Sequence, residues 1–86
     1  MSRQRRIEVI ESSEYVTVGE LVRLSGVRYS TLKYYTEEGM LPFEQAEENL
    51  TRSYRRIETL ERIALIKKRK EEGLSIPEIK MELGLS

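Results

Sequence analysis

The sequence predicts a mainly α-helical domain that carries a helix-turn-helix and a small β-hairpin. Three observations support this prediction: two segments begin with the same helix-capping pattern, glycines follow three of the predicted helices, and two short arms flank a polar turn near the middle of the chain. The chain has 86 residues, which suits one small domain with a single thin core.

The N-terminal part contains one open choice and one clear helix. Residues 3–12 fit either a short helix or a frayed arm. The helix predicted at 18–25 has Thr17 at its N-cap position and Glu20 as the capping-box partner, and Gly26 follows its last residue. This helix is therefore defined at both ends by local signals.

A second helix is predicted over residues 29–38, after only a short turn. Gly39 suits the left-handed conformation that ends many helices. A short helix, a turn containing glycine and a second short helix together form a helix-turn-helix candidate.

The next segment predicts a hairpin. Pro42 prevents the second helix from continuing, and residues 41–45 and 50–54 have the pattern of two short strands. Asn49 tolerates positive φ in the polar turn between them.

A long helix is predicted at 57–72. Its expected buried stripe consists of Ile57, Leu60, Ile63 and Ala64. Leu65 and Ile66 fall outside that stripe and imply cover from another element. The last helix, with Ser75 as N-cap and Glu78 as its capping-box partner, is the nearest element for this role.

Composition narrows the possible functions. The sequence has no Cys and no His, which removes disulfides, thiolate nucleophiles and most metal sites, so we expect no metal and no cofactor. No acid–base pair in a pocket is recognisable, so we expect no catalytic residues and no enzyme. The sequence has no signal peptide and no apolar run of about 20 residues, so we expect a cytoplasmic protein without a membrane partner.

Charge is balanced in total and uneven along the chain. Fifteen basic and fifteen acidic residues cancel, a balance that does not by itself suggest a nucleic-acid partner. Basic residues cluster at 3–6, 52–56 and 67–70, whereas glutamates cluster at 44–48. A neutral total can therefore hide a dipolar surface.

Two adjacent tyrosines in the second helix indicate its outward face. Neighbouring helical residues point about 100° apart, so Tyr34 and Tyr35 cannot face one core together. Leu32 and Tyr35 share the expected core side. The opposite side carries Tyr29, Ser30, Lys33 and Tyr34. Such phenol, hydroxyl and ammonium groups can donate to DNA phosphates or reach base edges, although an ordinary solvated face remains the alternative.

These segments together resemble the DNA-binding domain of MerR-family transcription regulators. The matching stretches are TVGEL at 17–21, SGV at 25–27, TLKYY at 31–35, EGMLP at 38–42, RSY at 52–54 and GLSIPEI at 73–79. Their order and spacing are more specific than any one motif, and the match extends over residues 17–84.

The resemblance implies a MerR-like winged helix-turn-helix with four helices and a two-stranded wing at 17–86, preceded at 1–16 by an arm or an extra short helix. It also implies sequence-specific binding to double-stranded DNA in transcription regulation, with the second helix in the major groove. Two alternatives stay open: an excisionase-like architectural protein that bends DNA, and a protein-interaction module on the same fold.

The resemblance assigns roles to single residues. Lys33 and Tyr34 would contact phosphate. Tyr29 and Ser30 would lie near bases. The full set that we expect to bind DNA is Thr17, Arg28, Tyr29, Ser30, Lys33, Tyr34, Arg52 and Tyr54.

Several positions depart from the family pattern or leave an alternative. Arg52 and Tyr54 match an Arg-x-Tyr that anchors the wing to the DNA backbone, but a plain surface charge and burial against the long helix are their alternatives. Lys33 stands where the family usually has an arginine, so the charge is kept but the planar guanidinium is lost. Arg28 replaces the serine that caps the second helix, and Thr36 replaces a glutamate.

The wing tip and the chain end lead to two further expectations. Glu44, Glu47 and Glu48 would repel phosphate, so we expect the wing tip to stay off DNA. Family members continue into a dimerising helix and an effector-sensing domain, whereas this sequence stops at Ser86. We therefore expect no small-molecule effector within this chain, and only a weak homodimer that forms on palindromic DNA.

Overall fold

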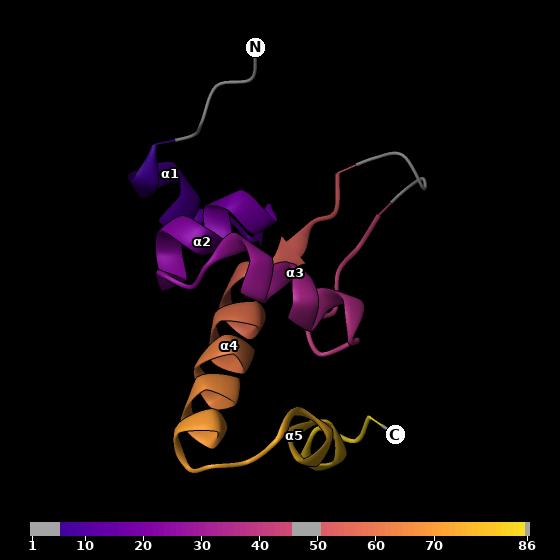
Figure 1. The fold of residues 1–86 in the computed structure, drawn as a ribbon. Coiled ribbons are helices and arrows are strands. Elements are labelled where there is room, and N and C mark those ends of the chain that lie inside the picture. The colour runs from indigo at the N-terminus through magenta and orange to yellow at the C-terminus, as the bar shows by residue number, and fades with distance from the viewer. Residues whose placement is uncertain (1–5, 46–50, 86) are drawn as a thin grey trace.

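The computed structural model describes residues 6–45 and 51–85, which form five helices and a small antiparallel sheet (Figure 1). In chain order the elements are α1 (Ile7–Ser12), β1 (Tyr15–Val16), α2 (Val18–Ser25), α3 (Tyr29–Glu37), β2 (Tyr54–Arg55), α4 (Arg56–Glu71) and α5 (Ile76–Glu82). The predicted MerR-like fold is confirmed. No helix in these two ranges is long and apolar enough to cross a bilayer.

The helices are arranged around α4. α2 packs against both α3 and α4, and α5 covers the far end of α4. Figure 1 shows α1 beside α2 at one end, α5 at the other, and the two wing arms extending on the side away from α1. This arrangement leaves one long side of α3 uncovered.

Local capping explains where the helices begin and end. The Glu20 N–H donates to Thr17 Oγ1 at 3.2 Å, and the Thr17 N–H donates to Glu20 Oε1 at 2.9 Å. Gly26 follows with φ of 75°, a left-handed conformation that suits glycine. α5 repeats the reciprocal capping box. α3 begins after Arg28 without a side-chain cap, as its departure from serine predicts.

The sheet contains more than the predicted hairpin. The two wing arms meet at Glu44 and Ser53, whose backbones exchange hydrogen bonds of 2.7 and 2.8 Å. β2 continues from the second arm and pairs with β1, where Val16 lies opposite Tyr54. The pairing with β1 is an addition to the prediction. The expected wing tip at 46–50, with Glu47 and Glu48, lies outside the described residues.

One hydrophobic core joins the helices to the sheet. Its buried members are Ile10, Val16, Leu21, Leu32, Met40, Leu41, Tyr54, Ile63, Ile66 and Ile79. The helix alternative for the N-terminal segment is confirmed over Ile7–Ser12, and Ile10 of α1 is fully buried in this shared core.

The predicted stripe on α4 is partly wrong. Ile57 is 59% exposed and Ala64 is exposed, whereas Thr59, Ile63 and Ile66 are buried. The buried positions follow a spacing of four and three residues, which places them on one helix face. That face packs against α2 and α5. Which side of α4 is buried therefore depends on the elements around it and not on the pattern within α4 alone.

Candidate nucleic-acid interface

The uncovered side of α3 is polar and aromatic. Its exposed side chains are Tyr29, Ser30, Lys33, Tyr34 and Glu37. Leu32 is fully buried, and Tyr35 packs against the core. The predicted directions of the adjacent tyrosines are therefore confirmed, and 47% of Tyr34 is exposed.

An open hollow lies beside this face, and we name it the α3-side hollow. It is lined by Val18, Tyr29, Lys33, Gln45, Thr51, Arg52 and Tyr54. These residues come from the first turn of α2, the first half of α3 and both wing arms. Thr17 stands at the adjacent start of α2, where its Oγ1 accepts the capping hydrogen bond from Glu20. Its hydroxyl hydrogen takes no part in the cap, so Thr17 fixes the helix start and stays a predicted DNA contact.

The α3 side carries two cations without an ion-pair partner. Within residues 6–45 and 51–85, neither Arg28 nor Lys33 forms a salt bridge. Both side chains are exposed. An ammonium or guanidinium group that forms no ion pair keeps its N–H donors available for an incoming anion.

Arg52 is held in place at the edge of the hollow. Its Nη1 donates to Glu37 Oε1 at 2.9 Å, and its Cζ lies 4.5 Å from the centroid of the Phe43 ring. The hydrogen bond from Arg52, with its positive charge, lowers the pKa of the Glu37 carboxyl. Arg52 is thus more than a plain surface charge, because it connects α3 to both arms of the wing.

Tyr54 lies at the base of the α3-side hollow and is almost entirely buried. Its side chain is only 2% exposed, and its hydroxyl lies 2.9 Å from Thr36 Oγ1. Because Thr36 donates its one hydroxyl hydrogen to the Leu32 carbonyl at 2.9 Å, Tyr54 donates to Thr36. The alternative of burial is correct for Tyr54, which joins α3 to the base of the wing.

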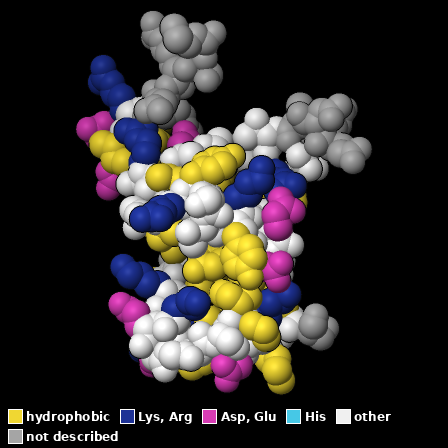
Figure 2. Space-filling model, viewed as in Figure 1, with side chains coloured by type: hydrophobic (Ala, Val, Ile, Leu, Met, Phe, Trp, Pro, Cys, Tyr) yellow, Lys and Arg dark blue, Asp and Glu magenta, His cyan; other side chains and the backbone are white. Residues whose placement is uncertain are grey.

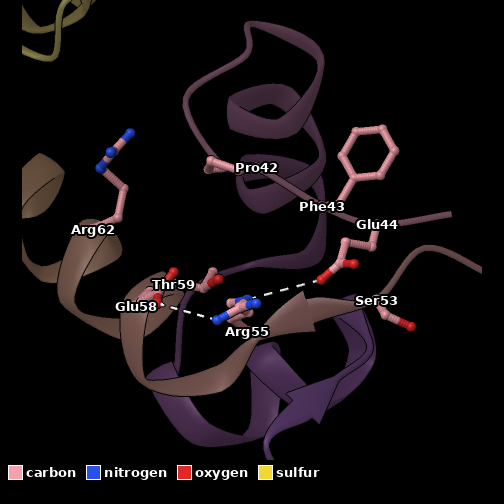
Figure 3. Close-up of a pocket in the computed structure, with 8 residues that line it drawn as sticks. All are labelled: Pro42, Phe43, Glu44, Ser53, Arg55, Glu58, Thr59 and Arg62. Atoms are coloured by element: carbon pink, nitrogen blue, oxygen red, sulfur yellow. Dashed lines mark ion pairs between the residues drawn. The ribbon is translucent and has the colours of Figure 1, made fainter.

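A second pocket lies on the other side of the wing base, and we name it the α4-side pocket (Figure 3). It is lined by Pro42, Phe43, Glu44, Ser53, Arg55, Glu58, Thr59 and Arg62. Arg55 lies between two carboxylates, 3.8 Å from Glu44 Oε2 and 3.7 Å from Glu58 Oε1. Arg62 donates to the Met40 carbonyl at 2.9 Å. Both arginines of this pocket therefore have partners within the chain.

A third hollow adds cations that were not predicted as binding residues. It lies between the α2–α3 turn and the second half of α4, and Arg28, Lys67 and Lys70 line it together with Glu71. Neither lysine forms a salt bridge with any residue that the structure describes. The basic cluster at 67–70 is visible in the sequence, but its position beside Arg28 depends on how α4 packs.

The charges thus flank the exposed part of α3. Figure 2 shows hydrophobic side chains running down this face from the level of α3 to α5, with Lys and Arg side chains on both sides.

In the described part of the chain, no group of three or more His, Cys, Asp or Glu side chains could hold a metal ion.

Comparison with known proteins gives an independent result. The model of the MerR HTH family of regulatory proteins matches residues 16–84. The mercuric resistance operon regulatory protein of Bacillus cereus is 34% identical over 68 residues, which are 79% of this chain and 51% of that protein. The chain therefore spans about half the length of this curated relative. No solved structure matches the chain significantly.

Proposed function

The chain belongs to the MerR HTH family of regulatory proteins, and from this premise we propose that it binds double-stranded DNA sequence-specifically to regulate transcription. One observation carries the proposal: the uncovered face of α3 adjoins a hollow in which Lys33 forms no ion pair with any described residue and Arg52 is held by Glu37 and Phe43. An exposed ammonium group and a partly exposed guanidinium group in one hollow suit the phosphates that border a DNA groove.

In this proposal, α3 enters the major groove. The groove is about 12 Å wide and admits an α-helix. Tyr29 and Ser30 lie in the first turn of α3, where their exposed hydroxyl groups suit base edges. Lys33 and Tyr34 lie one turn further on and suit phosphate oxygens. Base contacts by the first pair would supply the sequence specificity.

The two backbones of the duplex would be met on opposite sides of α3. The α3-side hollow offers Lys33, Arg52 and the first turn of α2, whose free N–H groups favour phosphate. The third hollow offers Arg28, Lys67 and Lys70. We therefore propose Lys67 and Lys70 as additional phosphate contacts, and we omit Tyr54.

A net charge of zero is compatible with this proposal because several acidic groups are paired with cations of the same chain. Glu72 and Glu82 both bind Arg69 near the junction of α4 and α5. Glu38 binds Lys80. These pairs neutralise charge locally, so they offset little of the charge of Arg28 and Lys33.

Assembly on DNA follows the same proposal. Ile10 of α1 is buried within its own chain, so we propose that residues 7–12 belong to the DNA-binding domain and do not form a separate arm. One α3 helix covers few base pairs, and two copies would meet weakly on a palindromic site. Sedimentation with and without palindromic DNA tests this stoichiometry, and a tight dimer without DNA would contradict it.

The salt dependence of duplex binding tests the proposed function. Fluorescence anisotropy with a labelled generic duplex measures the association constant across salt concentrations. We expect log K to fall with log salt by about 0.9 for each phosphate contact. Binding that is undetectable at low salt would contradict the proposal. Competition between the generic duplex and a site selected from random sequences then tests specificity.

A further inference from the structure

Glu37 places a negative charge on the face of α3 that we propose binds DNA. It lies in the last turn of α3, on the same uncovered face as Lys33, and its side chain is 54% exposed. A carboxylate close to DNA repels phosphate, so the residue requires a physical reason for its position. Its contact with Arg52 supplies that reason.

Two elements hold the guanidinium of Arg52 from different directions. Glu37 of α3 accepts a hydrogen bond from Nη1 at 2.9 Å, and the ring of Phe43 on the first wing arm lies 4.5 Å from Cζ. Arg52 itself belongs to the second wing arm and lines the α3-side hollow. A guanidinium has five N–H donors, so the hydrogen bond to Glu37 leaves most of them for another acceptor.

We propose that Glu37 is a positioning residue for DNA binding, because it fixes the Arg52 guanidinium between α3 and the wing before DNA arrives. This inference rests on the proposed function, since it assumes that Arg52 meets a phosphate in the α3-side hollow. An unattached arginine has many rotamers and loses that freedom when it binds. Glu37 removes part of this entropic cost in the free protein.

Two opposing effects decide whether Glu37 strengthens or weakens DNA binding. The Glu37 charge repels phosphate, but both members of the pair are partly exposed, and exposed charges are weakened by water and salt. Ordering one flexible side chain changes affinity by about threefold to tenfold. We infer that ordering outweighs repulsion, so the net effect of Glu37 on DNA affinity is favourable.

A double-mutant cycle separates the two effects. Glu37→Ala and Glu37→Gln are compared in the wild-type chain and in an Arg52→Ala chain, by anisotropy of a labelled generic duplex at low salt. We expect Glu37→Ala to weaken binding about threefold to tenfold in the wild-type background. Glu37→Gln retains an oxygen acceptor without the charge, so it should bind at least as tightly as the wild type.

In the Arg52→Ala background, the loss of duplex affinity caused by Glu37→Ala should disappear or become a small gain. Without Arg52 the positioning effect is absent and Glu37 acts only through its charge, on phosphate and on the nearby Lys33. Glu37→Ala should then leave binding unchanged or strengthen it slightly. Glu58→Ala is the matched control, because it removes a carboxylate that pairs with Arg55 in the α4-side pocket. We expect it to change affinity by less than about twofold, since exposed ion pairs contribute little. A Glu37→Ala variant that binds as tightly as the wild type, or more tightly, would overturn the positioning role.

A measurement without DNA distinguishes this inference from the proposed function. The NMR signals of the Arg52 guanidinium should show slow hydrogen exchange at the Nη1 group, which donates to Glu37, and restricted motion at Nε–Hε in the wild type, and should lose both in Glu37→Ala. The same signals in both proteins would overturn the positioning role, whatever the duplex result. If the signals change as expected while the wild type does not bind duplex DNA, the contact is real and the proposed DNA-binding function is wrong.

Discussion

The two sides of the wing base both carry basic residues, but these residues differ in their ion-pair partners. The α3-side hollow contains Arg52, which has one carboxylate partner, and Lys33, which forms no ion pair with any residue that the structure describes. The α4-side pocket contains Arg55 between two carboxylates and Arg62 on a backbone carbonyl. Because Lys33 forms no such pair, we propose that the α3 side, and not the α4 side, accepts phosphate.

The comparison also explains how a chain with zero net charge can suit DNA. Arg55 additionally lies 5.7 Å from the ring centroid of Tyr15, so the residues around it bind one another. On the α3 side Lys33 is exposed and forms no ion pair with any described residue, whereas Arg52 is partly exposed and pairs with one carboxylate. Net charge averages over both surfaces and hides this contrast.

The largest expected effect is the loss of stability on truncating Tyr54, which connects α3 to the wing base. Tyr54→Ala should lower the free energy of unfolding by about 3 to 5 kcal/mol, because it truncates a buried aromatic ring. Tyr54→Phe retains the ring and removes only the hydrogen bond to Thr36, which should cost about 1 kcal/mol. Urea denaturation followed by circular dichroism measures both. Equal, small losses would show that the ring does not support the core.

Lys33→Ala and Arg55→Ala test the comparison itself. Removing Lys33 should weaken duplex binding about tenfold, or ~1.4 kcal/mol, and make the salt slope shallower by about 0.9. Arg55→Ala removes an equal charge whose two carboxylate partners already compensate it, so affinity and slope should stay nearly unchanged. Anisotropy across salt measures both variants. If the two variants lose equal affinity, the two surfaces do not differ as we describe.

The wing tip should have a smaller effect. If the tip stays off DNA, replacing Glu47 and Glu48 with Gln should change duplex affinity by less than about twofold, because their distance from phosphate exceeds the screening length. The same anisotropy assay measures this change. A gain of about tenfold, ~1.4 kcal/mol, would instead place the tip close to phosphate.

The smallest expected effect is a pH dependence of stability. Arg52 lowers the pKa of Glu37 in the folded protein, so the ionised carboxylate stabilises the fold above its ordinary pKa of 4.5. That stabilisation is lost as pH falls through the lowered pKa, because protonation removes the attraction. The unfolding temperature of the wild type should exceed that of Glu37→Gln near pH 7, and the two should converge in acid. A difference that is independent of pH would contradict this account.

The sequence predicted the helices well because their ends depend on local signals. Thr17 with Glu20, and Ser75 with Glu78, fix two helix starts within a few residues of chain. The same locality made the directions of Tyr34 and Tyr35 predictable, since a helical wheel needs no information about distant residues.

Features that depend on distant packing were missed or wrong. β1 is two residues long and pairs with a strand almost 40 residues later, and such pairing leaves no local pattern. The exposure of Ile57 and the burial of Thr59 follow from where α2 and α5 lie. The burial of Tyr54 and the proximity of Lys67 to Arg28 have the same origin.

The central claim is that DNA meets the α3 side of the wing base and not the α4 side. Titrating the ¹⁵N-labelled chain with an unlabelled duplex, and following each amide by NMR, tests this claim most directly. We predict the largest shifts at Tyr29, Lys33 and Arg52, with little change at Arg55, Glu58 and Arg62. The largest shifts at Arg55, Glu58 and Arg62, with a silent α3, would contradict the claim.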